Sequence, residues 1–271
     1  MHDLPSSDTL LRASKALAAQ SKALAALARA VSPPTPGSLA KALDSLERAG
    51  EADAGAILRD GRAWLDAERA GRRERLATGL KSGCAEAGIE LLVVSKEPLE
   101  LRLPPFAARV DVERDRAELC FGGLPVAESR ADASGLLAAH RTAFAAIEGR
   151  GWDPAAQHRL LRRAWARLRA ETGQDWIELA DVLPEVTLLR QPRAFRAEPV
   201  GKRFEPYPRA SFVYDLWRLR RDRMLSVDGW RLSLGPATGG STMDRQRVFF
   251  VEDDRGQGQW QLTVRFTKED T

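Results

Sequence analysis

The chain has 271 residues, of which 44% are hydrophobic and 30% are charged. This length supports one large domain or two small ones with real cores, and the composition excludes a chain that is disordered throughout. The longest apolar stretches, such as Ile89–Val94, are far shorter than the roughly 18 to 20 residues that cross a bilayer, so we expect no membrane span. Residues 1–5 lack the features of a secretion signal. Two cysteines, Cys84 and Cys120, are too few for a disulfide framework or a structural zinc site, and the sequence predicts a cytoplasmic protein.

The formal net charge of +4 comes almost entirely from arginine, since only seven of the 42 cationic residues are lysines. Arginine pairs with phosphate and stacks on bases, which suits nucleic acid, but a GC-rich, bacterial-like composition also raises the arginine content without a functional cause. Residues 1–150 carry 21 cations and 21 anions, whereas residues 151–271 carry 21 and 17. Val186–Val251 alone holds 13 cations against six anions. We therefore expect the ligand-binding face in the C-terminal half.

A duplicated heptad dominates the start of the chain, where Ser14–Ala19 recurs as Ser21–Ala26. This repeat predicts a helix over residues 9–31 with a narrow seam that packs on a partner helix. The seam consists of Leu10, Leu17, Leu24 and Val31. We expect this helix to bind a protein partner or to self-associate.

A basic stripe, formed by Lys15, Lys22 and Arg29, follows the same repeat on another face of this helix. It fits an anionic membrane surface, a targeting peptide or a polyanion. It also fits the solvated flank of a coiled coil, which we favour because the apolar face is rich in alanine and lacks aromatic anchors.

The prolines in Ser32–Gly37 end this helix. Ser38 is the expected N-cap of a second helix that buries one face and stops at Gly50. That face carries Leu39, Leu43 and Leu46. A third helix is predicted over residues 51–87, with a bend or break at Gly61 or Gly71. Its apolar residues are Ile57, Trp64, Leu65, Leu76 and Leu80. Residues 1–87 are thus expected to form a helical hairpin or coiled-coil region.

Residues 88–150 are predicted to form an antiparallel β-meander with a covering helix. Alternating apolar residues indicate four short strands, of which Ile89–Ser95 is expected to be buried. Turns are predicted at Ser95–Pro98, Pro104–Pro105 and Glu113–Arg116. Asp132 should cap the helix, whose inner face is formed by Leu136, Leu137, His140, Phe144 and Ile147.

Residues 151–271 are predicted to form a basic helical and antiparallel-sheet region. Asp153 and Pro154 open an amphipathic helix that ends at Gly173. Its outer face carries Arg159, Arg162, Arg163 and Arg167, with no acid between Pro154 and Ala170. Further helices are expected over Trp176–Leu189, broken at Pro184, and over Arg209–Met224.

A long basic loop, Gln191–Pro208, joins the last two helices. Three final strands are predicted at Trp230–Leu234, Val248–Glu252 and Trp260–Phe266. The predicted class is therefore α+β, with an N-terminal helical hairpin, a central meander covered by helices, and a C-terminal helix plus three-stranded antiparallel sheet.

No catalytic, cofactor or metal site emerges from the sequence. Gly235–Thr242 approaches a phosphate-binding loop, but Ser241 stands where that loop needs lysine. None of the three histidines has a second ligand at metal-binding spacing. The carboxylates near Asp253 do not form a nuclease pattern. Both cysteines lie in apolar surroundings, where thiols are usually inert. We expect neither cofactor nor metal, and we lean against an enzyme.

Two hypotheses about function remain. The first is a non-enzymatic subunit that binds nucleic acid through cations of the C-terminal half, with Phe195, Phe204 and Tyr207 interleaved for base stacking. The expected contacts, besides the four helical arginines named above, are Arg193, Arg196, Lys202, Arg203, Arg209, Arg218, Arg220, Arg221 and Arg223. The second is a scaffold or regulatory subunit that docks a protein through the heptad helix. The first is slightly favoured.

Overall fold

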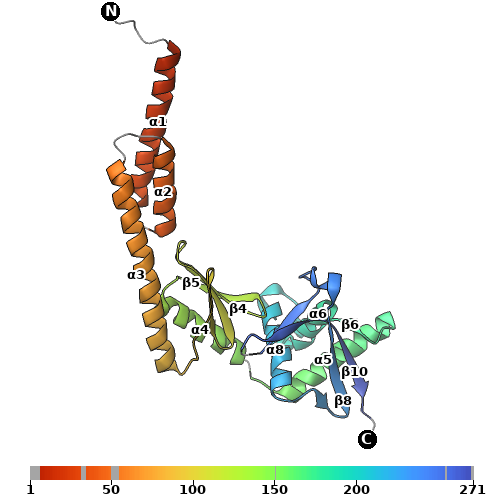
Figure 1. The fold of residues 1–271 in the computed structure, drawn as a ribbon. Coiled ribbons are helices and arrows are strands. Elements are labelled where there is room, and N and C mark those ends of the chain that lie inside the picture. Colours follow the sequence, from red (N-terminus) through yellow and green to blue (C-terminus); the bar gives the residue numbers. More distant parts are fainter. Residues whose placement is uncertain (1–6, 32–34, 50–54, 150, 254, 270–271) are drawn as a thin grey trace, which may run out of the picture. The chain divides into compact units, whose positions relative to one another are not determined.

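The computed structural model describes residues 7–31, 35–49, 55–149, 151–253 and 255–269. These residues form helices and two antiparallel sheets, so the predicted α+β class is confirmed (Figure 1). The chain divides into two compact units. The N-terminal unit consists of residues 1–88, 110–117 and 129–137, and the C-terminal unit consists of residues 89–109, 118–128 and 138–271.

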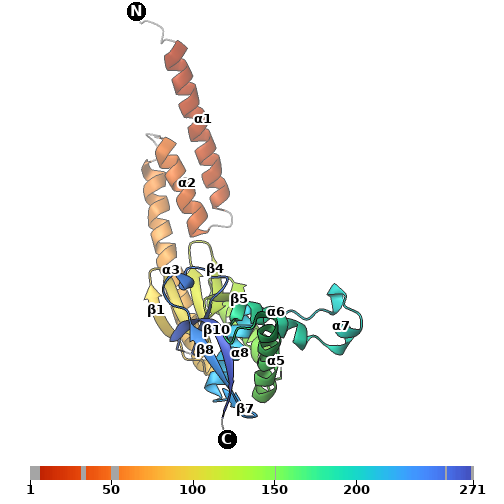
Figure 2. The same ribbon diagram turned by 90° about the vertical axis from the view of Figure 1, so that its right-hand side faces the viewer.

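Three helices make up most of the N-terminal unit: α1 (Ser7–Ala30), α2 (Pro36–Ala49) and α3 (Gly55–Ala87). Figures 1 and 2 show them side by side, with α1 extending well beyond the end of α2. Ala23 of α1 packs on Leu46 of α2, and the partly buried Leu24 and Leu27 surround this contact. Small and medium apolar side chains thus hold α1 against α2.

The second helix begins earlier than the sequence predicts. Pro36 is its first residue, so Thr35 takes the N-cap position. The Thr35 hydroxyl lies 3.3 Å from the backbone nitrogen of Ser38, and the Ser38 hydroxyl lies 3.4 Å from the backbone nitrogen of Thr35. This reciprocal pair is a capping box. Ser38 therefore completes the cap from inside the helix, and the prediction that it is the N-cap is wrong.

The predicted bend in the third helix is absent, because Gly61 and Gly71 both lie within one continuous helix. A Cβ atom at Gly61 would stand 2.7 Å from Cδ2 of Leu43, so glycine lets α2 pack closely on α3. Leu65, Leu76 and Leu80 are buried as predicted, whereas Trp64 is 42% exposed. Gly50, the predicted end of the second helix, lies outside the described part of the chain, and so does the side chain of Ile57.

The central meander has five strands in chain order: β1 (Leu92–Lys96), β2 (Leu99–Leu103), β3 (Phe106–Asp111), β4 (Arg116–Phe121) and β5 (Leu124–Ser129). The prediction of four strands missed β5. This strand contains Pro125 and has no buried residue, so it lacks the apolar alternation that marks a half-buried strand.

The first strand is not buried as predicted. Leu92, Val93 and Val94 are 38%, 60% and 61% exposed. The strand lies at an edge of the sheet and pairs only with β2. A continuous apolar run is typical of a strand covered on both faces, whereas the exposures of Leu92, Val93 and Val94 show that β1 is not covered in this way.

Helix α4 (Ala133–Glu148) follows the meander and begins as predicted. The Asp132 carboxylate accepts a hydrogen bond from the Gly135 backbone at 2.7 Å, and this contact and others lower the pKa of Asp132. His140 is buried, and its Nε2 lies 3.0 Å from the Pro104 carbonyl oxygen. His140 is thus a satisfied core residue.

The C-terminal unit continues with α5 (Pro154–Thr172), β6 (Ile177–Glu178), α6 (Leu179–Arg190), α7 (Arg193–Ala197) and the 3₁₀ turn η2 (Gly201–Arg203). Asp153 caps α5 by accepting from the Ala156 backbone at 2.9 Å, and Gly173 ends it at φ 72°. Both predictions are confirmed. Pro184 lies inside α6 and does not break it, so that prediction is wrong. The helix starts only at Leu179, because Ile177 and Glu178 pair with a strand.

Helix α8 (Arg209–Arg221) is buried along nearly its whole length, from Ala210 to Leu219. It precedes β7 (Ser226–Val227), β8 (Trp230–Pro236), the 3₁₀ turn η3 (Gly239–Thr242), β9 (Phe249–Glu252) and β10 (Gly258–Lys268). These strands and β6 form one sheet in the order β6-β10-β8-β7, with β9 also paired to β10. The three predicted strands are present, and β6 and β7 extend their sheet. Leu232 faces Phe266 across β8 and β10, and both are buried as expected.

Candidate nucleic-acid interface and an arginine-lined pocket

Two hydrogen bonds hold the start of α5 against the segment that ends α8. The Trp152 indole donates to the Asp222 carboxylate at 2.6 Å. Two turns further along, Nε2 of His158 lies 3.1 Å from the carbonyl oxygen of Leu225. Arginines that are about sixty residues apart in the sequence are therefore brought to neighbouring elements.

We call this set the α5–α8 arginine surface: Arg159, Arg162, Arg163, Arg220, Arg221 and Arg223. Arg159 pairs with Asp228 at 3.4 Å, and Arg221 pairs with Asp222 at 2.8 Å. The guanidinium of Arg162 lies 5.4 Å from the centre of the Trp230 ring.

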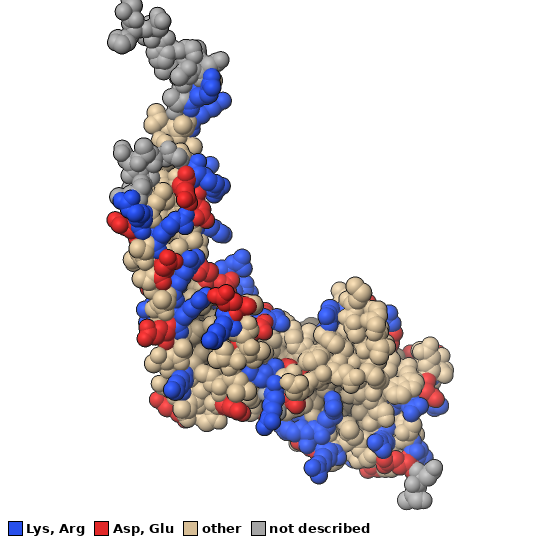
Figure 3. Space-filling view, in the orientation of Figure 1, with Lys and Arg blue, Asp and Glu red and all other residues tan. Residues whose placement is uncertain are grey.

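The other three members, Arg163, Arg220 and Arg223, are exposed and have no ion pair within the described residues. Figure 3 shows Lys and Arg side chains gathered on the lower edge of the C-terminal unit, where Figure 1 places the end of α8 and the start of α5. Three of the predicted arginines thus remain available to a ligand.

Arg218 is not part of this surface. Its side chain is 4% exposed, and it pairs with Glu148 at 2.9 Å while lying 4.0 Å from Asp215. Its guanidinium also lies 4.0 Å from the centre of the Trp152 ring. Neighbouring elements therefore enclose this turn of α8, and Arg218 is not accessible for the nucleic-acid contact that the sequence suggested.

Arg209 and Arg167 are also committed to contacts within the protein. Arg209 donates to the backbone carbonyls of Gln246 and Val248 at 2.8 and 3.1 Å, and burial lowers its pKa. Arg167 pairs with Glu171 and Glu185 at 3.2 and 3.3 Å. Neither is a free cation, so neither fits the role of a phosphate contact.

The remaining predicted cations, Arg193, Arg196, Lys202 and Arg203, lie on α7 and η2. Figure 2 shows α7 projecting far from β7 and the end of α8. Arg196 donates to the Gln191 carbonyl at 2.8 Å, and Arg203 pairs with Glu198 at 2.6 Å. Arg193 and Lys202 are exposed. The predicted cations therefore fall into two separate groups.

The interleaved aromatic residues do not form a stacking platform on the α5–α8 arginine surface. Phe195 and Phe204 pack edge-on against each other, with ring centres 5.6 Å apart, on the α7–η2 segment. Tyr207 is buried, and its hydroxyl donates to Asp215 at 2.6 Å. Tyr207 is thus unavailable to a base, and that part of the expectation is wrong.

The heptad seam of α1 is only partly used within the chain. Leu24 packs on the cluster formed by Ala23 and Leu46. Leu17 and Val31 are 64% and 52% exposed, and the side chain of Leu10 lies outside the described residues. Half of the predicted seam is therefore left uncovered.

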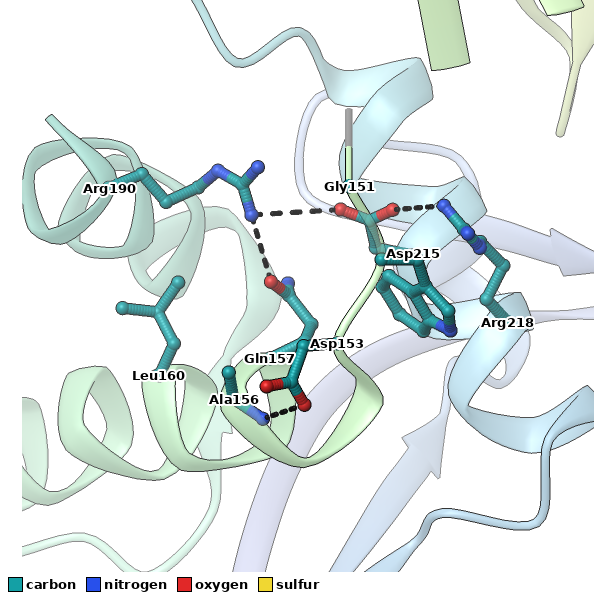
Figure 4. Close-up of a pocket in the computed structure, with 9 residues that line it drawn as sticks. Gly151, Asp153, Ala156, Gln157, Leu160, Arg190, Asp215 and Arg218 are labelled. Atoms are coloured by element: carbon teal, nitrogen blue, oxygen red, sulfur yellow. Dashed lines mark hydrogen bonds and ion pairs between the residues drawn. The ribbon is translucent and has the colours of Figure 1, made fainter. Parts of the chain in front are cut away.

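A polar pocket of about 230 Å³ lies among α5, α6 and α8 (Figure 4). Figure 4 shows Arg190 and Arg218 on opposite sides of the Asp215 carboxylate, from which they lie 3.9 and 4.0 Å. Gln157 accepts from Arg190 at 2.9 Å, and its amide nitrogen lies 3.3 Å from the Tyr207 hydroxyl. Hydrogen bonds thus link Asp215 to Tyr207, Tyr207 to Gln157 and Gln157 to Arg190, and the ion pair between Arg190 and Asp215 completes this polar network.

The pocket carries no excess of positive charge. Its two arginines face two aspartates, Asp153 and Asp215, and Glu148 neutralises Arg218 further. A buried network of this kind mainly fixes the helices that supply it. No sequence pattern predicted this network, although Asp215 within an apolar helix and Gln157 on the buried face of α5 were two available signals.

No metal or thiol chemistry is indicated in the described part of the chain. It contains no group of three or more His, Cys, Asp or Glu side chains placed to hold a metal. Burial raises the pKa of Cys84, and burial together with Glu118 raises that of Cys120 to about 12. In place of the helix that a phosphate-binding loop requires, Gly235–Thr242 ends in the short turn η3.

Comparison with known proteins gives no family: no family model, curated protein or solved structure matches this chain. Within the described residues, no helix is both long enough and apolar enough to span a membrane.

Proposed function

We propose that this protein is a non-enzymatic, cytoplasmic subunit that binds DNA or RNA through the α5–α8 arginine surface. The observation that supports it is the placement of arginines from two helices, distant in the sequence, on neighbouring elements; three of these arginines lack an acidic partner among the described residues. Such guanidinium groups are ready to pair with phosphates, and each pairing releases counterions.

The expected recognition is of the nucleic-acid backbone and not of base sequence. Arg163, Arg220 and Arg223 offer forked donors that match phosphate oxygens. No aromatic platform accompanies them, since Phe195 and Phe204 lie on the α7–η2 segment. We therefore expect affinity that depends strongly on salt and only weakly on sequence.

Charge reversal on this surface tests the proposal. The double variant Arg163→Glu/Arg220→Glu changes two exposed arginines without an ion pair among the described residues, so we expect normal folding. Fluorescence anisotropy with labelled single- and double-stranded DNA at increasing salt should show at least about tenfold weaker binding and a log–log salt slope smaller by about two.

The matched control is Lys41→Glu/Arg48→Glu, which makes the same charge change on exposed residues of the N-terminal unit. It should leave the slope unchanged. A third variant, Arg193→Glu/Lys202→Glu, tests whether contact extends to α7 and η2. Equal losses in the first variant and the control would contradict the proposal, because only net charge would then matter.

A scaffold function is the second candidate, and the uncovered heptad seam favours it. Leu17 is 64% exposed on a helix whose other end packs closely. A helix that leaves part of an apolar seam open is typical of coiled-coil docking. If the wild-type protein has no affinity for either nucleic acid at low salt but associates through α1, the scaffold function is favoured.

A further inference from the structure

Helix α1 carries one apolar face along its length, but its neighbours cover only part of that face. Ala23 is 3% exposed, whereas Leu17, one heptad before the packed Leu24, is 64% exposed. The Gln20 amide donates to the carbonyl of Ala49, the last residue of α2, at 3.4 Å. Residues 7–19 therefore extend past the end of α2, as Figures 1 and 2 show. At the rise of an α-helix these residues span about 20 Å. We call this segment the α1 overhang.

An open apolar groove lies at the other end of α1. Its volume is about 530 Å³, and its lining includes Leu27, Val31, Leu39, Leu43, Asp60 and Trp64. Val31 and Trp64 are 52% and 42% exposed. The same helix thus presents an uncovered apolar segment at one end and an unfilled apolar groove at the other.

We propose that a second copy of this chain fills both: two α1 helices pack antiparallel, and the overhang of each lies in the groove of the other. This rests on the proposed scaffold function and names its partner. The duplicated heptad makes the arrangement self-complementary, because a two-fold axis between Gln20 and Ser21 places Leu17 opposite Leu24 of the partner. A symmetric contact of this kind closes as a dimer.

The charges agree with an antiparallel arrangement. The overhang carries the exposed Lys15, and no acidic residue occurs between Asp8 and Asp44. The groove is apolar except for Asp60, which is exposed at its edge. Antiparallel packing brings the basic overhang toward Asp60 of the partner copy.

Sedimentation equilibrium of the full chain tests the dimer. We expect a concentration-dependent dimer for the wild type and a monomer for Leu17→Glu. The matched control is Leu11→Glu, which changes a 55% exposed leucine on another face of the same helix and should keep the dimer. A monomeric wild type would overturn the proposal, and so would equal behaviour of the two variants.

Disulfide trapping tests the direction of packing. In the antiparallel dimer Ser21 lies next to the two-fold axis, so Ser21→Cys should form a cross-linked dimer under oxidation, whereas Ser14→Cys should not. Both serines are exposed, and the native cysteines are buried and should stay unreactive. Cross-linking of both variants would indicate a parallel coiled coil and contradict the proposal. The DNA titration above is a separate readout, so failure of the dimer leaves nucleic-acid binding testable.

Discussion

Arg218 and Arg220 stand two residues apart on α8, yet they belong to different regions of the molecule. Arg218 has a buried side chain that joins Glu148 and the Asp215 network, whereas Arg220 is exposed and has no ion pair within the described residues. The buried region uses arginine to hold helices together. The α5–α8 arginine surface, in contrast, leaves arginine side chains such as that of Arg220 free for a ligand. The number of arginines is therefore a poor measure of a binding surface, and the position of each one decides its role.

Removing the buried arginine, Arg218, should lower the free energy of unfolding more than any other change proposed here. Arg218→Ala removes the cation that pairs with Glu148 at 2.9 Å and lies 4.0 Å from Asp215. It leaves these carboxylates, at 24% and 4% side-chain exposure, with the longer contacts to Arg221 at 3.5 Å and to Arg190 at 3.9 Å. Breaking a buried pair from one side costs about 3–5 kcal/mol. Urea unfolding should show a loss of this size for Arg218→Ala, and Arg220→Ala should stay within about 0.5 kcal/mol of the wild type. Similar losses for both variants would remove the distinction between the two regions.

A smaller loss of unfolding free energy is expected from a change at the start of α5, which lies between the two regions. Asp153→Ala deletes the side chain that accepts from the Ala156 backbone at 2.9 Å, and loss of such a cap costs about 1 kcal/mol. Glu171→Ala is the control at the other end of the helix, where an exposed ion pair with Arg167 contributes little. The same urea titration measures both, and a neutral Asp153→Ala would show that α5 is held by its packing alone.

The smallest expected effect is a pH dependence at His158, which is fully buried beside the arginine surface. Burial lowers the pKa of His158 below its ordinary value of 6.5. The unfolded chain then binds the proton more readily than the folded chain. The free energy of unfolding is therefore highest above pH 6.5 and falls as the pH drops from 6.5 toward the lower pKa of the folded state. The slope of the unfolding free energy against pH corresponds to the uptake of at most one proton.

Unfolding free energies between about pH 8 and about pH 5 should show this decrease, and His158→Gln should flatten it. A wild-type stability that rises on acidification through this range would contradict the assignment of a buried, neutral histidine.

Local signals in the sequence predict the fold well. Asp153, Pro154 and Gly173 mark the ends of α5 because capping depends on a few adjacent residues. The alternation of apolar and polar residues in β8 and β10 likewise predicts that Leu232 and Phe266 face the same core, where they lie opposite each other. These features need no knowledge of distant contacts.

Burial is harder to predict, because it depends on what other elements cover. The apolar run Leu92–Val94 suggests a buried strand, but it lies at an exposed sheet edge. Helix α8 is buried without interruption from Ala210 to Leu219 and becomes exposed at Arg220, so its own periodicity does not separate Arg218 from Arg220. The sequence could therefore predict which region of the chain holds the candidate interface. Only the structure shows which arginines of that region are exposed.

The salt dependence of DNA binding by wild type and Arg163→Glu/Arg220→Glu tests nucleic-acid binding most directly. We expect measurable affinity for the wild type at low salt, with a log–log slope that falls by about two in the double variant. Absence of affinity in the wild type, or equal slopes in the two proteins, would contradict the proposal that these arginines contact phosphate.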